Sequence, residues 1–473
     1  MKFLKSRLFR FIASAGLAAL IYFLCPPCFN RLYLLGVLVL LLVLVNFNTF
    51  FARFSWPTHI ARLLVGGLFI FSGFIKANDP VGFSIKLKEY FEVFGQGFSC
   101  DMKLQDNSGP DCEKNDAATA AAATPAAHEE SFLAPVWEFF ADNALLLAIL
   151  ICGVEIVLGI FLLMGFQVKL TLWLLLAMIV FFSFLTFYSA CCNKVTSCGC
   201  FGDAIKLTPW ESFWKDLILL ILITVLFVGM DHIKPLIGNK MIFFTIIAVG
   251  TIASFWFPVH TWRHLPVIDF RPYKIGTDLC KGLQMPDPCK PDSMETILYY
   301  KNLKTNEIKP FTIKNYPWQD TLNWTWYCTS NKVIREGNCK KAILDFAITA
   351  PGTGTDTTLA MVCAKGPQFM LIMHDITEAD RDAMGAINDF YALSSKDGIP
   401  FYALSGALEE QVAQFRAETK AAYPFYSVDG TALKTAIRSN PGLILVIDGV
   451  VKDMWHHNDF PSYNDVKNTY LKK

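Results

Sequence analysis

Seven apolar stretches dominate the first 257 residues of this 473-residue chain. A helix needs roughly 20 apolar residues to cross about 30 Å of hydrocarbon, because it rises about 1.5 Å per residue. The stretches are Leu8–Leu24, Leu32–Phe51, Ile60–Ile75, Ala144–Met164, Leu170–Tyr188, Leu217–Met230 and Met241–Phe257. The sixth is long enough if its helix begins at Thr208-Pro209-Trp210-Glu211, which has the residues of an N-cap and a capping box. The sequence therefore predicts an integral membrane bundle of about seven transmembrane helices.

Composition agrees with a membrane protein. Of all residues, 53% are hydrophobic and only 18% are charged. The formal net charge of +1 offers no electrostatic attraction for nucleic acid, and the chain carries no nucleic-acid motif. We therefore expect membrane lipid, and no nucleic acid, among the partners.

The positive charges between the stretches predict the orientation. Short cytoplasmic loops carry an excess of Lys and Arg. Such residues precede the first stretch and lie between the second and third, the fourth and fifth, and the sixth and seventh. This arrangement predicts a cytoplasmic N-terminus and a C-terminal half on the outer side. A cleaved signal peptide at Met1–Leu24 is the alternative, but the segment lacks a clean small-residue cleavage site.

The cysteines point to an oxidising outer compartment. With this orientation every cysteine except Cys152 falls on the outer side, where disulfides form and persist. The outer set is Cys25, Cys28, Cys100, Cys112, Cys191, Cys192, Cys198, Cys200, Cys280, Cys289, Cys328, Cys339 and Cys363. We therefore expect a multi-pass protein of a bacterial inner membrane, with its C-terminal half in the periplasm.

The densest cysteine cluster follows the fifth stretch, at Cys191–Asp203. Its C-C…C-x-C spacing fits zinc poorly, because structural zinc sites use spaced pairs. Two interpretations stay open. A bond between Cys198 and Cys200 would close a small strained ring of oxidising potential, whereas bonds from Cys191 or Cys192 would pin the loop.

Two other cysteine pairs precede this cluster. Cys25-Pro26-Pro27-Cys28 has the C-x-x-C form, and its prolines favour a structural disulfide in a turn between helices. Cys100 and Cys112 flank a polar loop and form either a local disulfide or an arm that shuttles electrons to Cys198. The local disulfide is the favoured interpretation.

Three segments resemble the DoxX/MauE group of membrane proteins: Arg62–Pro80, the stretch CGVEIVLGIFLL that contains Glu155, and Cys198–Asp203 (CGCFGD). The chain is similar to the Bacteroidetes-type member with an added periplasmic domain. The resemblance implies a four-helix core and a role in maturing disulfide-rich proteins. The group is often compared with vitamin K epoxide reductase, which passes electrons from thiols to quinone. On that comparison Cys198 and Cys200 are the reactive pair, Glu155 is the intramembrane acid, and quinone is the cofactor.

Glu155 is notable without the resemblance, because an ionised carboxylate inside a membrane costs several kcal/mol and needs a partner or a function. Ser72 or Arg62 on the third stretch is its expected partner. A helix-packing hydrogen bond and a role in proton transfer are both open.

The chain divides into four expected parts: a helical hairpin at 1–55, the DoxX/MauE-like domain at 56–257, a β-rich linker domain at 258–365 and a last domain at 366–473. The second part contains an amphipathic helix at Val81–Phe94, expected in the headgroup layer, and a periplasmic insertion at 97–135.

The linker domain contains local cysteine pairs and three tryptophans. The spacing suggests the disulfides Cys280/Cys289 and Cys328/Cys339, which leaves Cys363 unpaired. Trp318, Trp324 and Trp326 are expected to be core residues.

Residues 366–473 show the element order of a thioredoxin-like α/β domain. We expect strands at 368–373, 401–404, 425–429, 443–447 and 450–455, and helices before 401, at 409–419, at 431–438 and around 463–471. Ala436–Val451 closely resembles the cis-proline segment of thioredoxin, so Pro441 should follow a cis bond.

The dithiol of thioredoxin is missing from this domain. The segment after the first strand, His374–Asp380, contains no cysteine, and without a thiolate this domain cannot run disulfide exchange. We therefore interpret it as a docking module, with His374 and Asp375 at an ordinary strand end.

Two functional hypotheses follow. The first is an accessory, maturation or scaffold component that presents a redox-inactive thioredoxin-like domain to a periplasmic protein or membrane complex. The second is a quinone-linked thiol–disulfide oxidoreductase that uses Cys198 and Cys200. The missing dithiol favours the first, and Glu155 with the CGCFG motif favours the second.

Overall fold

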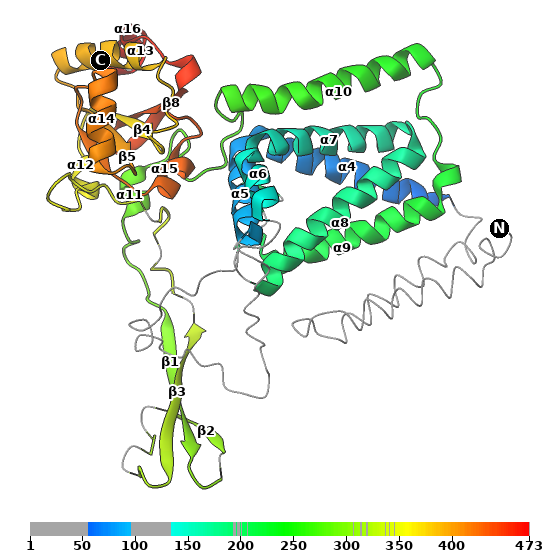
Figure 1. The fold of residues 1–473 in the computed structure, drawn as a ribbon, viewed down its shortest axis with the longest axis horizontal. Helices are drawn as coiled ribbons and strands as arrows, with labels where there is room; N and C mark the ends of the chain where they lie inside the picture. Colours follow the sequence, from blue (N-terminus) through cyan, green and yellow to red (C-terminus); the bar gives the residue numbers. More distant parts are fainter. Residues whose placement is uncertain are drawn as a thin grey trace.

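The computed structural model describes residues 55–95, 134–192, 195, 199, 201–205 and 207–472, apart from 306, 313, 314, 318, 319, 336, 340 and 345. A helical bundle precedes an elongated three-stranded sheet and an α/β domain (Figure 1). The expected hairpin at 1–55, with its cysteines 25 and 28, lies outside the described residues except for Ser55. So do Cys100, Cys112, Cys198, Cys200 and Trp318.

The bundle contains four helices with the length and composition of membrane spans within the described part of the chain: α4, α7, α8 and α10. Helix α9 is the predicted sixth span, and it packs against α8 and α4. Its first turns carry Glu211, Lys215 and Asp216, which lower its mean hydropathy. The bounds are α4 Trp56–Asn78, α7 Ala144–Met164, α8 Val168–Cys192, α9 Pro209–Val228 and α10 Lys240–Arg263. The structure thus contains a helical membrane core.

The start of α9 is set by the capping box that the sequence predicts. The Thr208 hydroxyl accepts a hydrogen bond from the backbone of Glu211, and the Glu211 carboxylate accepts one from the backbone of Thr208. Both interactions use N–H groups that a helix end otherwise leaves unpaired.

Glycines allow α4 and α7 to lie unusually close. A Cβ at Gly66 would meet the Leu163 side chain at 2.6 Å, and one at Gly159 would meet the Gly66 carbonyl oxygen at 2.8 Å. At Gly73 it would meet the Cβ of Glu155 at 3.0 Å. Small residues let helix backbones approach inside a membrane, and here they bring Glu155 next to α4.

The predicted amphipathic helix is α5, Pro80–Gly95, which runs across one end of the bundle beside α6, Ala134–Asp142 (Figure 1). Its apolar face is buried: Phe83, Leu87, Tyr90, Phe91 and Phe94 are at most 5% exposed. They pack on α6, α7 and α8. This apolar face is therefore covered by protein.

Strands β1 (Ser293–Asn302), β2 (Ile308–Thr312) and β3 (Trp324–Arg335) form an antiparallel sheet in the order β2-β1-β3, which projects from the rest of the chain (Figure 1). Trp324 contacts Phe311 with ring centroids 5.3 Å apart. Trp326 is 50% exposed, so its expected core position is wrong.

The α/β domain contains a five-stranded sheet in the order β6-β5-β4-β7-β8. Strand β4 pairs in parallel with β5, which pairs in parallel with β6, while β7 and β8 are antiparallel. The strands are β4 Pro367–Met373, β5 Phe401–Ser405, β6 Phe425–Ser427, β7 Gly442–Ile447 and β8 Val450–His456. The longer helices are α13 Met384–Lys396, α14 Glu409–Thr419 and α15 Gly430–Ala436. The short helices of the domain are η4 His457–Asp459, α16 Tyr463–Val466 and η5 Lys467–Leu471. Other short helices precede the domain: η3 Met230–His232 after α9, α11 Leu279–Leu283 and α12 Thr358–Val362.

Both faces of this sheet are covered. One cluster packs Phe369 and Leu371 against α13, α14 and α16. The other packs Met370 and Ile372 against α15 and against Leu279 and Val362 of the preceding segments. Strand β4 is apolar at nearly every position because both of its faces are buried.

The disulfides differ from the expected local pairs. Cys280 bonds to Cys363 and Cys289 bonds to Cys339. The expected pairs Cys280/Cys289 and Cys328/Cys339, and an unpaired Cys363, are therefore wrong. Because α11 and α12 pack side by side on the sheet, they bring together two cysteines that are 83 residues apart. Cys328 also forms a disulfide.

Candidate functional site at the junction of the bundle and the α/β domain

Glu155 lies on α7 and forms a buried ion pair with Lys76 of α4. The Lys76 Nζ lies 2.7 Å from Glu155 Oε1 and 2.6 Å from Oε2. Ser72, one turn before Lys76, places its hydroxyl 3.4 Å from Oε1. The Lys76 ammonium also lies 4.4 Å from the centre of the Phe182 ring. Among the described residues the carboxylate is thus held by an ammonium and a hydroxyl group.

Of the two alternative partners expected for Glu155, Ser72 is confirmed, whereas Lys76 was not expected. Arg62 instead donates hydrogen bonds to the carbonyl oxygens of Leu162 and Leu163. The missed signal was the spacing of Ser72 and Lys76, which are four residues apart and share a helix face.

Asp216 of α9 is a second buried acid near this pair. Its side chain is 1% exposed, accepts a hydrogen bond from Thr186 and lies 2.7 Å from Lys215 Nζ. A very small cavity of about 10 Å³ is lined by Lys76, Glu155 and Asp216 together. The bundle therefore holds two acids around one polar pocket.

The cysteine loop between α8 and α9 is fixed to this end of the bundle. Ser189 donates a 2.5 Å hydrogen bond to the Val195 carbonyl oxygen, and Val195 is fully buried. The Phe201 ring contacts Phe71 and lies under the Lys215 ammonium at 5.2 Å. Cys192, at the end of α8, is disulfide-bonded. The described ends of the loop are thus packed against the bundle.

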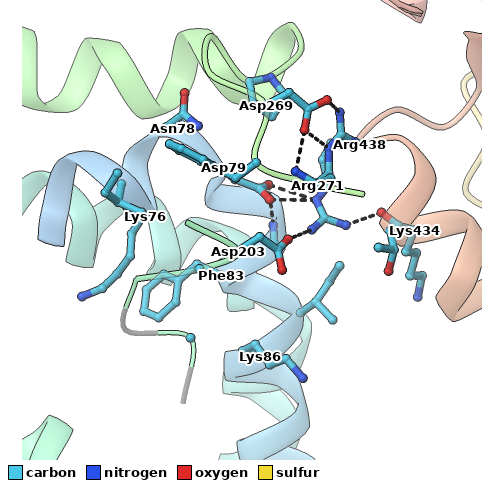
Figure 2. A pocket seen from close by; sticks show the side chains of 18 of the residues that line it. Lys76, Asn78, Asp79, Phe83, Lys86, Asp203, Asp269, Arg271, Lys434 and Arg438 are labelled. Carbon is cyan, nitrogen blue, oxygen red and sulfur yellow. Dashed lines mark hydrogen bonds and ion pairs between the residues drawn. The ribbon is translucent and has the colours of Figure 1, made fainter. Parts of the chain in front are cut away.

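Four parts of the chain enclose a cavity of about 260 Å³ next to this loop (Figure 2). The bundle contributes the end of α4 and the start of α5, the cysteine loop contributes Gly199, Gly202 and Asp203, and the α/β domain contributes α15 and Arg438. The connector after α10 completes the wall with residues 266–271. Lys76 lines this cavity and also the small pocket beside Glu155.

Ion pairs hold the two halves together around the cavity. Arg438 donates through Nε to both oxygens of Asp79, at 3.1 and 3.0 Å, and its Nη2 lies 3.7 Å from Asp203 (Figure 2). Arg271 binds Asp269 and donates to the Ala436 carbonyl oxygen. Arg438 and Arg271 are 9% and 3% exposed, so both pairs are largely shielded from water.

The connector binds the bundle at a second point. Asn78 at the end of α4 exchanges two hydrogen bonds with the backbone of Ile268. On the far side of the domain, His264 contacts Asp459 at 2.7 Å, and Asn458 donates to the Arg263 carbonyl oxygen. The connector that follows α10 is therefore bound to the bundle through Ile268 and to the α/β domain through His264.

The segment that carries Arg438 continues into a cis-proline. The Asn440–Pro441 peptide bond is cis, as expected from the sequence. Asn440 donates to the Asp375 carbonyl oxygen and accepts from the backbone of Asp380. The proline loop thus lies against the cysteine-free segment that follows β4.

The pKa of His374, which follows β4, is lowered mainly by burial. Burial lowers the pKa of His374 to about 4, and the charges of Lys434 and Arg438 act in the same direction while Asp375 opposes them. His374 is therefore neutral near pH 7 and no general base with a pKa near neutrality.

Ser439, His457 and Asp380 form a line that resembles a hydrolase triad. The Ser439 hydroxyl lies 3.1 Å from His457 Nδ1, and His457 Nε2 lies 3.6 Å from Asp380. However, Ser439 is 3% exposed and donates its hydrogen to the Pro441 carbonyl oxygen. A hydroxyl committed in this way secures the proline loop and does not serve as a nucleophile.

Comparison with known families covers two parts of the chain. Residues 120–229 match the family model of methylamine utilisation protein MauE, which spans α6 to α9 and the cysteine loop. Residues 294–336 match a domain of unknown function, DUF8463, which coincides with the three-stranded sheet. No curated protein and no solved structure matches the chain. The MauE match supports a MauE/DoxX-like membrane core and does not extend to Arg62–Pro80.

Proposed function

We propose that the chain is an accessory or scaffold component for protein maturation in a bacterial inner membrane. In this proposal the N-terminus is cytoplasmic, and residues 367–472 form a redox-inactive thioredoxin-like docking domain in the periplasm. Residues 120–229 match the family model of methylamine utilisation protein MauE, and the maturation role is the one that the resemblance to this family implies. The proposed docking role rests on the fold of the α/β domain and on its contact with the bundle.

Several features support a thioredoxin-like domain. Strand β4 lies centrally, with parallel neighbours on one side and the antiparallel strands β7 and β8 on the other. A cis-proline precedes β7, and its loop contacts the segment after β4, where thioredoxin carries its dithiol. That segment contains no cysteine, so the domain can bind a partner and cannot exchange disulfides.

One observation carries the proposal: this cysteine-free domain is ion-paired through Arg438 to the CGCFGD loop of the bundle. A docking domain in this position would bring a bound partner next to the only dense cysteine cluster of the chain. Recruitment and thiol chemistry would then be divided between the two halves.

Site-specific photocrosslinking of the full chain in cells tests this function. A photoreactive residue at Thr431 or Thr435, which line the cavity, should capture a periplasmic protein that also co-purifies in mild detergent. The same residue at Glu418, on α14 away from the cavity, is the control. Recovery of only the uncrosslinked chain at both sites would exclude a recruiting role.

A second candidate function is a quinone-linked thiol–disulfide oxidoreductase. The Lys76–Glu155 pair favours it, because Lys76 lines both the inner pocket and the cavity beside the cysteine loop. In this role Cys198 and Cys200 would form a disulfide and pass two electrons and two protons to quinone, which would become quinol, and Glu155 would assist the proton release.

Thiol trapping separates the two functions. Alkylation in cells with and without quinone should change the state of Cys198 and Cys200 if the chain is an oxidoreductase. The Cys280–Cys363 and Cys289–Cys339 bonds are internal controls that should stay oxidised. An unchanged state of Cys198 and Cys200 would eliminate the oxidoreductase function.

A further inference from the structure

Charge is divided unequally across the junction cavity. The connector contributes Arg271, which is ion-paired with Asp269, and the α/β domain contributes the cations Lys434 and Arg438. The bundle contributes the carboxylates Asp79 and Asp203, and both pair with Arg438. Its own cations at the cavity are already matched, Lys76 by Glu155 and Lys86 by Glu89. The surface of the α/β domain at this junction is therefore basic, and the bundle surface that covers it is acidic.

The basic surface contains a cation that the carboxylates of the bundle do not pair with. Among the described residues, Lys434 has no ion-pair partner, although it lies one turn before Arg438 and lines the cavity. The cavity of about 260 Å³ leaves room for a few side-chain atoms beside the two resident aspartates. Burial is the largest cause of the depressed pKa of His374, and the nearby charges of Lys434 and Arg438 lower it further.

The surface is also rigid before a ligand arrives. Arg271 is anchored by Asp269 and the Ala436 carbonyl oxygen, and Arg438 donates to the Lys434 carbonyl oxygen. Asn440 ties the proline loop to Asp375. A preorganised basic surface loses little entropy when it binds a carboxylate.

We propose that this surface, formed by Arg271, Lys434 and Arg438, is a receptor for an acidic peptide segment of a partner protein. Asp79 and Asp203 of the bundle are its resident occupants, and the partner displaces them. This inference rests on the proposed recruiting function and gives the chemistry of the recruited segment. Carboxylates in peptide segments occupy the surface now, which favours a peptide over a lipid headgroup.

The test uses the full chain in zwitterionic nanodiscs and measures fluorescence anisotropy of a labelled peptide. The probe has the sequence of residues 199–205 with its cysteine replaced by serine, so that it keeps the aspartate and has no thiol. The control probe carries asparagine in place of the aspartate.

We expect the Asp79→Asn/Asp203→Asn variant to bind the aspartate probe at least tenfold more tightly than the unmodified chain, because no resident carboxylate then competes for Arg438. Adding Arg438→Gln should abolish this gain. Adding Arg416→Gln should not, since Arg416 lies on α14 and does not line the cavity. If the double variant does not fold, Asp203→Asn alone keeps the 3.0 Å Arg438–Asp79 pair and should give a smaller gain.

Equal binding of the aspartate and asparagine probes would overturn the proposal. Equal binding of the aspartate probe by the Asp79→Asn/Asp203→Asn variant and by the unmodified chain would also overturn it. A soluble short-chain phosphatidylglycerol is the competing ligand. If it binds in an Arg438-dependent manner while the peptide does not, the surface is a lipid site and the proposal is wrong. The anisotropy assay measures the affinity for an acidic peptide, whereas photocrosslinking measures the capture of a partner protein in cells. Either experiment can therefore fail while the other succeeds.

Discussion

At the scale of single residues, the buried Lys76–Glu155 pair is a costly arrangement inside the bundle. Both side chains are at most 4% exposed, and ions inside a membrane are costly unless they are paired. The pair persists because Gly73 lets the two helices approach and Ser72 supplies a further polar contact.

We predict that Glu155→Leu destabilises the chain by about 3–5 kcal/mol, because it leaves the Lys76 ammonium buried and unpaired. The matched double variant Lys76→Met/Glu155→Leu removes both charges and should recover most of this loss. Thermal unfolding in detergent, followed by tryptophan fluorescence, measures both. A double variant as unstable as the single one would show that the pair is not the cause.

A second residue-scale prediction concerns His456, which is 3% exposed at the end of β8. Burial lowers its pKa to about 4, and the charge of His457 acts in the same direction. The unfolded state, with a pKa near 6.5, therefore binds more protons between pH 4 and pH 6.5, and stability rises with pH across this window.

The expected result is a Tm that falls on acidification from pH 6.5 to pH 4.5 by more in the natural chain than in His456→Asn. Asparagine can still accept the hydrogen bond that Asn458 donates to His456. Parallel Tm curves of the two proteins across this range would contradict the assignment.

Sequence reasoning reached Glu155 and Pro441 because a membrane acid and a cis-proline segment are local signals. It missed Lys76, because the predicted apolar stretch ended at Ile75 and Lys76 lies one residue beyond it. It gave no indication of Arg438, because the role of this residue depends on its ion pair with Asp79, which is 359 residues away. Long-range charge pairs leave no periodic signal in one sequence.

At the scale of secondary-structure elements, sequence periodicity predicted the helices well, whereas cysteine spacing predicted the disulfide pairs badly. Helix α14 spans Glu409–Thr419 as expected, and α9 begins at its predicted capping box. These features depend on neighbouring residues. The pairing of Cys280 with Cys363 depends instead on α11 and α12 packing together on the sheet.

We predict that Cys280→Ser/Cys363→Ser lowers stability by about 2–5 kcal/mol, the usual effect of losing a disulfide that closes a long loop. Hydrogen exchange should rise first in α11 and α12, which this bond joins. The control is Cys289→Ser/Cys339→Ser, whose bond lies near the base of the projecting sheet. Equal exchange in α11 and α12 for both variants would show that the first bond does not secure these helices.

At the scale of the whole molecule, the two halves meet through charges and a connector of few residues. Arg438→Asp should separate the α/β domain from the bundle, because it places like charges beside Asp79 and Asp203. The charge-reversed variant Asp79→Arg/Arg438→Asp should restore most of the contact.

Spin labels at Thr435 and Ile85, on opposite walls of the cavity, measure this separation. We expect a longer and broader distance distribution in Arg438→Asp and a return toward the original one in the reversed pair. The separation should also increase the rate at which a soluble maleimide labels the reduced cysteine loop. An unchanged distance in Arg438→Asp would mean that other contacts suffice to hold the junction.

The connector between α10 and Arg271 spans residues 264–271. A tether of this length keeps the bundle carboxylates at an effective concentration on the order of millimolar around Arg438. A soluble acidic segment of equal intrinsic affinity would therefore half-occupy the surface only at millimolar concentration. A partner that is itself confined to the membrane surface gains the same local enrichment, so the recognised proteins should be membrane-bound or lipid-anchored.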